Sequence, residues 1–293
     1  MNCGYVALIG RPNVGKSTLM NHLLGQKISI TSRKPQTTRH QILGIKTTDL
    51  GQAIFVDTPG MHDGEQRALN RYLNRTADTS LLGVDLVVWL IDSLEWHEYD
   101  DVIIKKLHRA GVPVILAVNK VDRVKDKQTM LPFFAEAGKK YPFAEIIPVS
   151  ALKGNNLEQL EQILMARLPS SALIYPEDQV TDRPERFLTA EIIREKLIRR
   201  LGQELPHALT VEIERYEETP AITRIYAIVW VERDTQKNIV IGKQGALLKS
   251  IGTDARQDIE VLIDNKVYLQ LWVKVKKGWA NNERALNSLG FNE

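Results

Sequence analysis

The sequence predicts an α/β protein with a mostly parallel sheet flanked by helices, followed by a smaller α+β domain. The first observation is that short apolar runs alternate with helical stretches over the first half of the chain. The second is a polar, proline-containing segment around residues 170–183, where this alternation stops. The third is that two long strand patterns follow each other directly beyond that segment. Alternation of strand and helix is typical of a parallel sheet, and consecutive strands indicate a separate domain.

The first domain is expected over residues 1–170. Its apolar runs are short and continuous, which indicates strands that are buried on both faces. These runs lie at residues 5–10, 52–60, 84–92, 112–120 and 144–150. The helical stretches between them include residues 16–24, 66–82, 98–110 and 155–168. Ligands of such folds bind at the carboxyl ends of the strands, so we expect the functional residues there.

A linker is expected over residues 171–184 and a second domain over residues 185–293. The second domain should begin with a helix, continue with three strands and a glycine loop, and end with one or two helices and a strand. These elements are predicted at residues 185–201, 208–216, 222–234, 238–241, 242–245, 246–264 and 266–278.

The composition is that of an ordinary globular protein, because 43% of the 293 residues are hydrophobic and 26% are charged. No apolar run approaches the roughly 20 residues that span a bilayer, and the first residues lack a secretory signal, so we expect a cytoplasmic protein. The only cysteine, Cys3, excludes an intrachain disulfide and a cysteine-based zinc site. Residues 181–293 carry 18 basic and 17 acidic side chains, so any nucleic-acid contact there must depend on local clusters.

The segment GRPNVGKS at residues 10–17 has the spacing of a phosphate-binding loop between a strand and a helix. Its glycines allow the loop to wrap tightly, so that backbone N–H groups face phosphate oxygens. Lys16 can neutralise charge on the β- and γ-phosphates, and the Ser17 hydroxyl can ligate Mg²⁺. A helix-opening turn without a ligand is the alternative, and the strand before the loop and the helix after it disfavour that alternative.

The segment DTPG at residues 57–60 follows the next strand pattern. Asp57 can enter the coordination shell of Mg²⁺, and the Gly60 N–H can meet a γ-phosphate. Asp-Thr-Pro-Gly is also common turn chemistry, so this motif gains weight only beside the others.

The segments NKVD at residues 119–122 and SAL at 150–152 end two further strands. Asp122 can accept two hydrogen bonds from guanine that adenine cannot donate, which disfavours an ATP-dependent enzyme. Asn119 would connect this loop to the phosphate loop, and Lys120 would lie along the base. The Ala151 N–H is available to guanine O6, although SAL alone is as well explained as an ordinary turn.

Four motifs in this order resemble the translation-factor-related class of small GTPases. Residues 26–45 then occupy the place of the first switch of that class, with Thr38 as the ligand of Mg²⁺ and γ-phosphate and Thr37 as the alternate. Met61 stands where Ras-like GTPases have a water-orienting glutamine, so intrinsic hydrolysis should be slow. Asn13 matches GTPases that bind K⁺ beside the phosphates in place of an arginine finger.

The predicted cofactors are GTP or GDP and Mg²⁺. The sequence leaves open whether K⁺ is also bound. The residues expected to contact the nucleotide are Gly10, Arg11, Pro12, Asn13, Val14, Gly15, Lys16, Ser17, Thr18, Asp57, Thr58, Pro59, Gly60, Met61, Asn119, Lys120, Val121, Asp122, Ser150, Ala151 and Leu152. The expected magnesium ligands are Ser17, Thr38 and Asp57. Catalysis is assigned to Asn13, Lys16, Thr38 and Gly60.

A second glycine loop lies in VIGKQGALLKSIG, but it lacks the Gly-Lys-Ser that a second phosphate loop would need. A Gly-x-x-Gly turn between two helices clamps single-stranded nucleic acid in KH domains, although the pattern alone is weak and also occurs in ordinary turns. The final strand alternates apolar residues with aromatic and basic ones, which can stack bases or simply face solvent. The expected RNA contacts are Gly242, Lys243, Gln244, Gly245, Lys249, Lys274 and Lys276.

Over essentially its whole length the chain resembles the Era family of bacterial GTPases, within the TrmE-Era-EngA-like group. Besides the GTPase motifs, the resemblance is carried by YPEDQVTDRPERFLTAEIIREKL, LTVEIERY, VIGKQGALLKSIG and LWVKVKKGWANNERALNSLGF. It implies a phosphate-loop GTPase domain followed by a type II KH domain, in a monomer.

The resemblance also implies binding to the 3′ region of small-subunit (16S) ribosomal RNA and assistance in maturation of the 30S subunit, coupled to cell growth and division. It further implies RNA binding in the GTP form, release upon hydrolysis, and peripheral association with the inner membrane. The rival hypothesis is a GTPase whose C-terminal domain docks a protein or a membrane surface, with Gly-x-x-Gly as an ordinary turn. Binding of ribosomal RNA fragments in GTP and in GDP separates the two.

Overall fold

The computed structural model describes residues 1–34, 36–60, 68–92, 94–202 and 209–291. The chain divides into two compact units. The first unit contains Met1–Ser29, Thr38–Asp63 and Leu73–Asp182, and the second contains Ile30–Thr37, Gly64–Tyr72 and Arg183–Glu293. Within the described ranges, no helix is long and apolar enough to cross a membrane.

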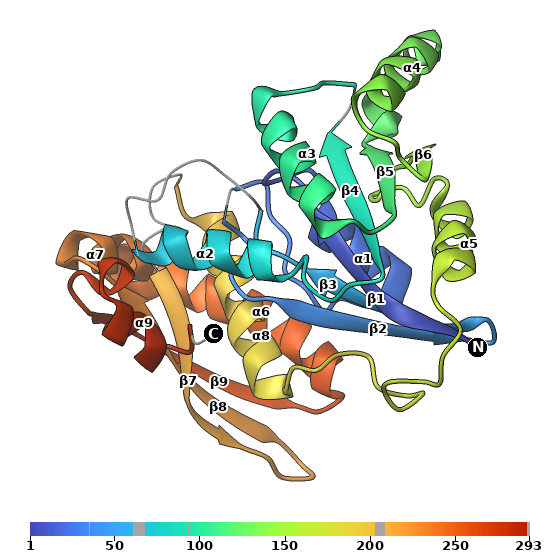
Figure 1. Ribbon diagram of the computed structural model, residues 1–293. Coiled ribbons are helices and arrows are strands. Elements are labelled where there is room, and N and C mark those ends of the chain that lie inside the picture. The colour runs from blue at the N-terminus through green and yellow to red at the C-terminus, as the bar shows by residue number, and fades with distance from the viewer. Residues whose placement is uncertain (35, 61–67, 93, 203–208, 292–293) are drawn as a thin grey trace. The chain divides into compact units, whose positions relative to one another are not determined.

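The first unit is built on a six-stranded sheet with the strand order β2-β3-β1-β4-β5-β6 (Figure 1). The strands are β1 (Asn2–Ile9), β2 (Ile42–Thr48), β3 (Gly51–Asp57), β4 (Leu86–Asp92), β5 (Val114–Asn119) and β6 (Glu145–Pro148). All neighbours pair in parallel except β2 and β3, which are antiparallel. The carboxyl ends of β1, β3, β4, β5 and β6 therefore meet at one edge of the sheet.

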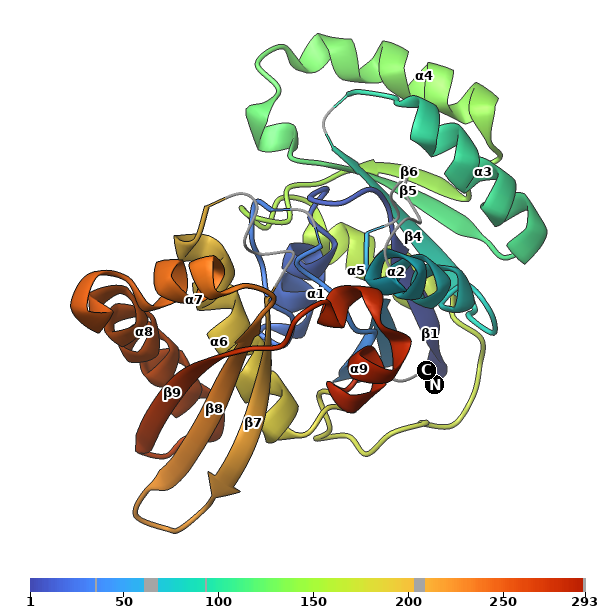
Figure 2. The same ribbon diagram turned by 90° about the vertical axis from the view of Figure 1, so that its left-hand side faces the viewer.

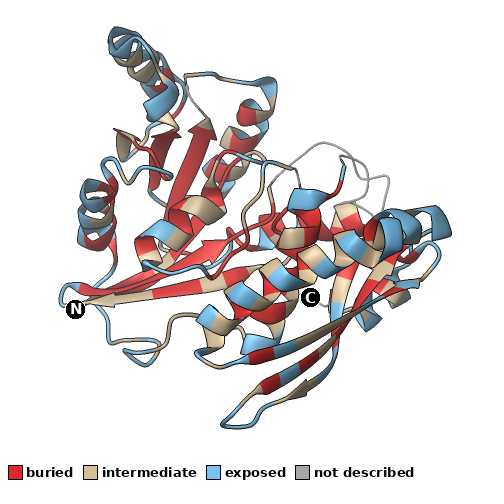
Figure 3. Ribbon diagram, turned by 180° about the vertical axis from the view of Figure 1, so that it is seen from behind, coloured by how far each residue is buried: buried red, intermediate tan, exposed pale blue. Residues whose placement is uncertain are grey.

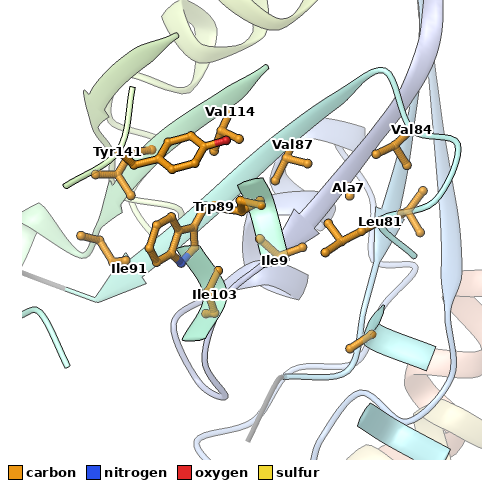
Figure 4. Close-up of a cluster of buried hydrophobic side chains, with 14 of the residues drawn as sticks. Ala7, Ile9, Leu81, Val84, Val87, Trp89, Ile91, Ile103, Val114 and Tyr141 are labelled. Atoms are coloured by element: carbon orange, nitrogen blue, oxygen red, sulfur yellow. The ribbon is translucent and has the colours of Figure 1, made fainter. Parts of the chain in front are cut away.

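Helices cover both faces of this sheet. They are α1 (Lys16–Leu24), α2 (Ala68–Thr79), α3 (Glu98–Ala110), α4 (Met130–Lys140) and α5 (Leu157–Arg167). Helices α2, α3 and α4 add side chains to one buried cluster, which includes Trp89 of β4 and Ile103 of α3 (Figure 4). Trp89 packs against Trp96 and Phe143. The strands are buried along most of their length, whereas the helices carry the exposed residues (Figure 3). Burial on both faces explains why the strands have continuous apolar runs.

The predicted fold class is confirmed, and the structure adds elements that the sequence pattern did not indicate. All five strands expected in the first domain are present. Strand β2 was not expected, because residues 26–45 were assigned to a switch segment. It mixes buried residues with partly exposed ones, which is a weaker signal than a continuous apolar run. The predicted helix at residues 66–82 is present as α2, although its first residues lie outside the described ranges.

The segment expected to be a linker follows the edge of this sheet. The Ile45 N–H of β2 donates to the Val180 carbonyl at 2.7 Å, and the Leu43 N–H donates to Asp182 Oδ1 at 3.1 Å. Further along, Gln52 Oε1 accepts the Tyr175 N–H at 3.0 Å. Val180 and Asp182 therefore satisfy backbone groups of the edge strand that would otherwise face solvent, and Tyr175 binds the side chain of Gln52 on the neighbouring strand β3.

The second unit contains a three-stranded sheet with the order β7-β8-β9, in which β7 and β8 are antiparallel and β8 and β9 are parallel (Figure 2). Its elements are α6 (Glu185–Arg200), β7 (Leu209–Glu217), β8 (Thr223–Val231), α7 (Asp234–Ile241), α8 (Ala246–Ile263), β9 (Val267–Val275) and α9 (Glu283–Ser288). Helices α6, α7 and α8 bury one face of the sheet in a common apolar cluster that contains Ile193, Val240 and Ile251.

The predicted strand at residues 238–241 is wrong, because these residues form the end of helix α7. Three consecutive β-branched residues suggested a strand. The helix is stabilised at its start by Gln236, whose Oε1 accepts the N–H groups of Glu232 at 2.9 Å and Arg233 at 3.0 Å. It is also stabilised by Val240, which is fully buried in the core, so tertiary packing overrides the local preference.

Candidate functional site

The loop between β1 and α1 has a shape that requires glycine at two positions. Gly10 has a φ of 141°, and a Cβ there would lie 2.3 Å from the Leu90 carbonyl oxygen. Gly15 has a φ of 109°, and a Cβ there would lie 2.3 Å from Asn119 Nδ2. The glycines therefore allow the loop to lie against the ends of β4 and β5 and to lead directly into the N-terminus of α1, where anions are favoured.

Lys16, the first residue of α1, is buried within this loop. Its Nζ donates to the carbonyl oxygens of Gly10 at 3.0 Å and Arg11 at 3.1 Å. Burial lowers the pKa of Lys16 to about 8, and the nearby Asp57 carboxylate offsets this only in part. Burial also raises the pKa of Asp57, against the hydrogen bonds and the Lys16 charge that favour its ionised form. Without a ligand, keeping either group charged therefore costs folding free energy.

Asp57 lies at the centre of a cluster of hydroxyl groups. Its Oδ2 accepts hydrogen bonds from Ser17 Oγ and Ser29 Oγ, both at 2.7 Å. Ser17 Oγ also lies 2.9 Å from Thr38 Oγ1. The second carboxylate oxygen, Oδ1, is buried and has no hydrogen-bond partner among the described residues. An unpaired buried carboxylate oxygen beside two hydroxyls fits a hard divalent cation such as Mg²⁺.

Thr37 and Thr38 differ in what their hydroxyls contact. Thr38 Oγ1 lies beside Ser17, whereas Thr37 Oγ1 donates to the Lys34 carbonyl at 2.7 Å and lies 2.6 Å from Ser32 Oγ. The geometry therefore places Thr38, and not Thr37, beside Ser17 and Asp57, an alternative that the sequence left open.

The DTPG turn packs closely on the phosphate loop. Thr58 Oγ1 donates to the Leu8 carbonyl at 2.9 Å, and a Cβ on Gly60 would lie 2.7 Å from Pro12 Cα. Glycine is required at residue 60 because the two loops are in van der Waals contact. Met61, the position without the water-orienting glutamine, lies outside the described residues.

Asn119 connects three of the four loops. Its Nδ2 donates to the Val14 carbonyl at 2.7 Å, and its Oδ1 accepts the Ala151 N–H at 2.9 Å. The Ala151 N–H, which the sequence assigned to guanine O6, therefore has a protein partner in this structure. Asn119 is almost completely buried, so its role here is to hold the loops together.

Asp122 is exposed at the end of this loop, and its orientation is set by Ser150. The buried Ser150 hydroxyl donates to Asp122 Oδ1 at 2.6 Å, which leaves Oδ2 free of any hydrogen bond from Ser150. Lys120 has a φ of 63°, and its Nζ donates to the Asn13 carbonyl at 2.8 Å and to Asp92 Oδ2 at 2.5 Å. The Asp122 carboxylate is thus held in place beside a lysine stem that spans to the phosphate loop.

Three residues of this site were not found from the sequence. Ser29 donates to Asp57, Asp92 pairs with Lys120, and Asp100 accepts from Arg11 Nε at 3.2 Å. Asp92 ends β4 directly opposite Asn119 of β5, so matching the ends of the two strands would have indicated it. No sequence signal indicated Ser29 or Asp100, because neither ends a strand. Four further residues that the sequence predicted to contact the nucleotide lie within or beside these four loops. They are Thr18, Pro59, Val121 and Leu152.

The Gly-x-x-Gly turn connects α7 to α8 in the second unit. Gly242 has a φ of 72°, and a Cβ there would lie 2.6 Å from Leu247 Cβ, so glycine is needed for packing within the turn. Gly245 has a φ of 77°, and a Cβ there would meet nothing within 4 Å. Lys243 and Gln244 are exposed between them. The turn therefore presents open backbone at Gly245 and a cation beside it.

The three other lysines expected to contact RNA lie on different elements. Lys249 is exposed one turn into α8. Lys274 and Lys276 lie at the end of β9 and just beyond it, where each ammonium group is above the ring of Trp230, at 5.9 and 5.7 Å from its centroid. Trp230 is on the sheet face opposite α7 and α8, so the structure does not bring these two lysines to the Gly-x-x-Gly turn.

Helix α6 holds the segment Ile30–Thr37 within the second unit. The Thr31 N–H donates to Glu195 Oε1 at 2.8 Å, and Lys34 Nζ donates to the Ile198 carbonyl at 2.5 Å. Arg194, which pairs with Glu191 in the interior, also donates to the Thr37 carbonyl. Both ends of this segment are therefore held by side chains of α6.

Comparison with known proteins identifies both units. Residues 5–120 match the family described as 50S ribosome-binding GTPase, and residues 204–280 match the KH domain. The chain is 55% identical over 289 residues to GTPase Era of Ectopseudomonas mendocina, and the alignment covers 99% of this chain and 97% of that protein. It is 56% identical to GTPase Era of Marinobacter nauticus, covering 99% and 95%. The chain belongs to the Era family of GTPases.

Two solved structures of Era share the fold over the full length of both chains. One is a variant of Aquifex aeolicus Era bound to GDP·AlF₄⁻, with a TM-score of 0.97 and 38% identity. The other is Era in complex with MgGDPNP and nucleotides 1506–1542 of 16S ribosomal RNA, with a TM-score of 0.97 and 39% identity. The family resemblance and the fold class expected from the sequence are confirmed, and the chain is a GTPase.

Nucleotide binding should take up protons at pH 8.5. With a pKa of about 8, most Lys16 side chains are neutral at that pH, and the phosphates of GDP will raise the pKa and protonate them. We expect an uptake of roughly half a proton or more per GDP, measured by calorimetry in two buffers that differ in ionisation enthalpy. At pH 6.5 Lys16 is already protonated and should contribute no uptake.

The matched control is Lys16→Arg, because arginine keeps its proton at both pH values. The variant should lose the uptake at pH 8.5 whatever its affinity. Equal uptake in the variant and the wild type would show that the proton does not go to Lys16.

Proposed function

We propose that this GTPase is a nucleotide-controlled switch that binds the 3′ region of 16S ribosomal RNA through its KH domain and assists maturation of the 30S subunit. The observation that carries the proposal is that one chain combines a complete set of guanine-nucleotide loops with a Gly-x-x-Gly turn whose Gly245 faces open space. A solved relative holds both MgGDPNP and nucleotides 1506–1542 of 16S ribosomal RNA, which supports the same pair of ligands here. In this proposal residues 1–170 form the GTPase domain, 171–184 the linker and 185–293 the KH domain.

The phosphate loop would hold the nucleotide through its backbone N–H groups and Lys16. Ser17, Thr38 and Asp57 would hold Mg²⁺, because their oxygens already cluster and Asp57 Oδ1 has no hydrogen-bond partner among the described residues. When bound, the metal ion neutralises charge on the β- and γ-phosphate oxygens. Gly60 would direct its N–H to the γ-phosphate, while Asp122 would read the guanine edge.

The proposed hydrolysis is slow, because Met61 cannot orient a water molecule as glutamine does. Asn13, at a φ of 64° in the phosphate loop, is the residue that we propose for K⁺ beside the phosphates. Hydrolysis should then be faster when K⁺ replaces Na⁺, and equal rates in the two salts would exclude this role.

The family resemblance extends the proposal to the setting of the protein. It favours a cytoplasmic monomer that contacts the inner membrane peripherally and couples subunit assembly to cell growth and division. This part rests on the resemblance alone. The rival function, a C-terminal domain that docks a protein or a membrane surface, is an outcome of the RNA-binding test below.

Asp122→Asn should weaken GTP and improve xanthosine triphosphate. The amide places a donor where guanine also donates, whereas xanthine presents an acceptor there. An unmatched buried polar group costs roughly 1–3 kcal/mol, which corresponds to about a 5- to 150-fold change in affinity. Competition between the two nucleotides, measured for both proteins, checks this. Unchanged GTP affinity with no gain for the xanthine nucleotide would show that Asp122 does not read the base.

Gly245→Asp should strongly weaken binding to the RNA of nucleotides 1506–1542. The substitution adds bulk and a negative charge where the turn is open, and Asp tolerates the left-handed backbone better than most residues. Affinity is measured by filter binding in GTP analogue and in GDP. Hydrolysis without RNA should change little, because that chemistry belongs to the other unit.

Gly245→Asn is the matched control, since it has the same shape without the charge, and it should bind more tightly than the Asp variant. Lys243→Ala should weaken all RNA sequences alike and reduce the salt dependence by about one phosphate contact. Full RNA affinity in a folded Gly245→Asp variant would remove the turn from RNA binding and favour the docking function.

A further inference from the structure

The outer face of the second unit's sheet carries exposed aromatic rings that the proposed function does not use. Helices α6, α7 and α8 pack against the other face, which supplies every strand residue of the buried cluster. Alternation along β8 and β9 places Tyr226, Tyr268 and Trp272 on the outer face. Tyr268 and Trp272 are 46% and 38% exposed, so both residues reach solvent.

These three rings form a continuous platform. Tyr226 stacks on Trp272, with the ring centroids 6.0 Å apart and the planes at 17°. Tyr268 meets Tyr226 edge to face, also at 6.0 Å. The guanidinium of Arg215 lies above the Tyr226 ring at 5.1 Å. The rings hold one another in position, and those of Tyr268 and Trp272 keep a side open to solvent, as a surface for stacking requires.

Charge on this face is divided between its strands. Strands β8 and β9 contain no acidic residue and contribute Arg224 and Lys274, with Lys276 just beyond. The acidic residues all lie on β7, and each already has a partner: Glu212 accepts from Trp230 Nε1 at 2.7 Å, Glu217 pairs with Arg215, and Glu214 lies 3.7 Å from Lys274. Lys276 also donates to Ser288 Oγ at 2.9 Å.

Aromatic rings beside cations, with no acid on the same two strands, match the requirements of single-stranded nucleic acid. Bases stack on rings regardless of sequence, and phosphates need nearby Lys or Arg. We propose that the outer face of β8 and β9 is a second RNA-contacting surface, where Tyr226, Tyr268 and Trp272 stack unpaired bases and Arg224 and Lys274 meet phosphates. This inference rests on the proposed RNA-binding function and adds to it a surface on the opposite side of the sheet from the Gly-x-x-Gly turn.

The test compares Trp272→Leu with Trp272→Phe in the full-length protein. Leucine keeps apolar bulk but removes the π-face, whereas phenylalanine keeps a face that can stack. The probe is the RNA of nucleotides 1506–1542, with a GTP analogue bound, and affinity is measured by fluorescence anisotropy. We expect about a tenfold loss for Trp272→Leu and little loss for Trp272→Phe. Photo-cross-linking of the wild type should place RNA adducts on Tyr268 or Trp272.

Gly245→Asp, measured in parallel, separates failure of this inference from failure of the proposed function. If Gly245→Asp loses the RNA while Trp272→Leu binds it fully, the turn binds RNA and the outer face does not. If Gly245→Asp also binds fully, the turn does not bind this RNA either, and the proposed function fails at its assigned site. Equal losses in the Leu and Phe variants would show that Trp272 supports the fold and does not stack a base. Full RNA affinity of Trp272→Leu, without RNA adducts on Tyr268 or Trp272 in the wild type, would overturn the inference.

Discussion

The candidate nucleotide site depends on two ionisable groups of opposite charge that are buried at one edge of a parallel sheet. Burial lowers the pKa of Lys16 from 10.5 to about 8, so its charge destabilises the fold below about pH 8, and this cost disappears as the pH rises past 10.5. Burial raises the pKa of Asp57 above 3.8, so its charge destabilises the fold above the raised pKa, and this cost disappears as the pH falls below 3.8. Near neutral pH both costs are present. A phosphate group beside Lys16 and a cation beside Asp57 Oδ1 would relieve them, which links nucleotide binding to stability.

The rest of the first unit explains how such costly groups are held in place. Parallel pairing brings the ends of β1, β3, β4 and β5 together, and Asn119 joins two of the following loops to the phosphate loop. Ser17 and Ser29 hold one oxygen of Asp57 and leave the other without a hydrogen bond. The large apolar cluster around Trp89 stabilises the unit, so a polar site that costs folding free energy can persist. In the second unit, by contrast, the turn at Gly245 is open, and Tyr268 and Trp272 on the outer sheet face are exposed.

Residues that belong to a contiguous motif could be predicted from the sequence, and those that act across the fold could not. The loops at Gly10, Asp57, Asn119 and Ser150 were found because each follows an apolar strand at a fixed spacing. Ser29 and Asp100 were missed, because their partners Asp57 and Arg11 are far away in sequence and no motif connects them. The end of helix α7 was predicted to be a strand. Local β-propensity does not show that Val240 is buried in the core of the second unit as part of a helix. Lys274 and Lys276 were grouped with the Gly-x-x-Gly turn, because the sequence did not show that α7 and α8 cover the opposite face of the sheet.

The most direct test of this account is the thermal stability of nucleotide-free Asp57→Asn at pH 7. The amide oxygen can still accept from Ser17 and Ser29, but the amide carries no charge at any pH, so the cost of burying an ionisable carboxyl group is removed. The account predicts a higher Tm than the wild type without nucleotide, together with loss of the extra stabilisation that Mg²⁺ gives to the GTP-analogue complex. Asp122→Asn, which replaces an exposed carboxylate, should leave the nucleotide-free Tm almost unchanged. A lower Tm for nucleotide-free Asp57→Asn, or full stabilisation by Mg²⁺, would contradict the claim that this buried charge is kept for the metal ion.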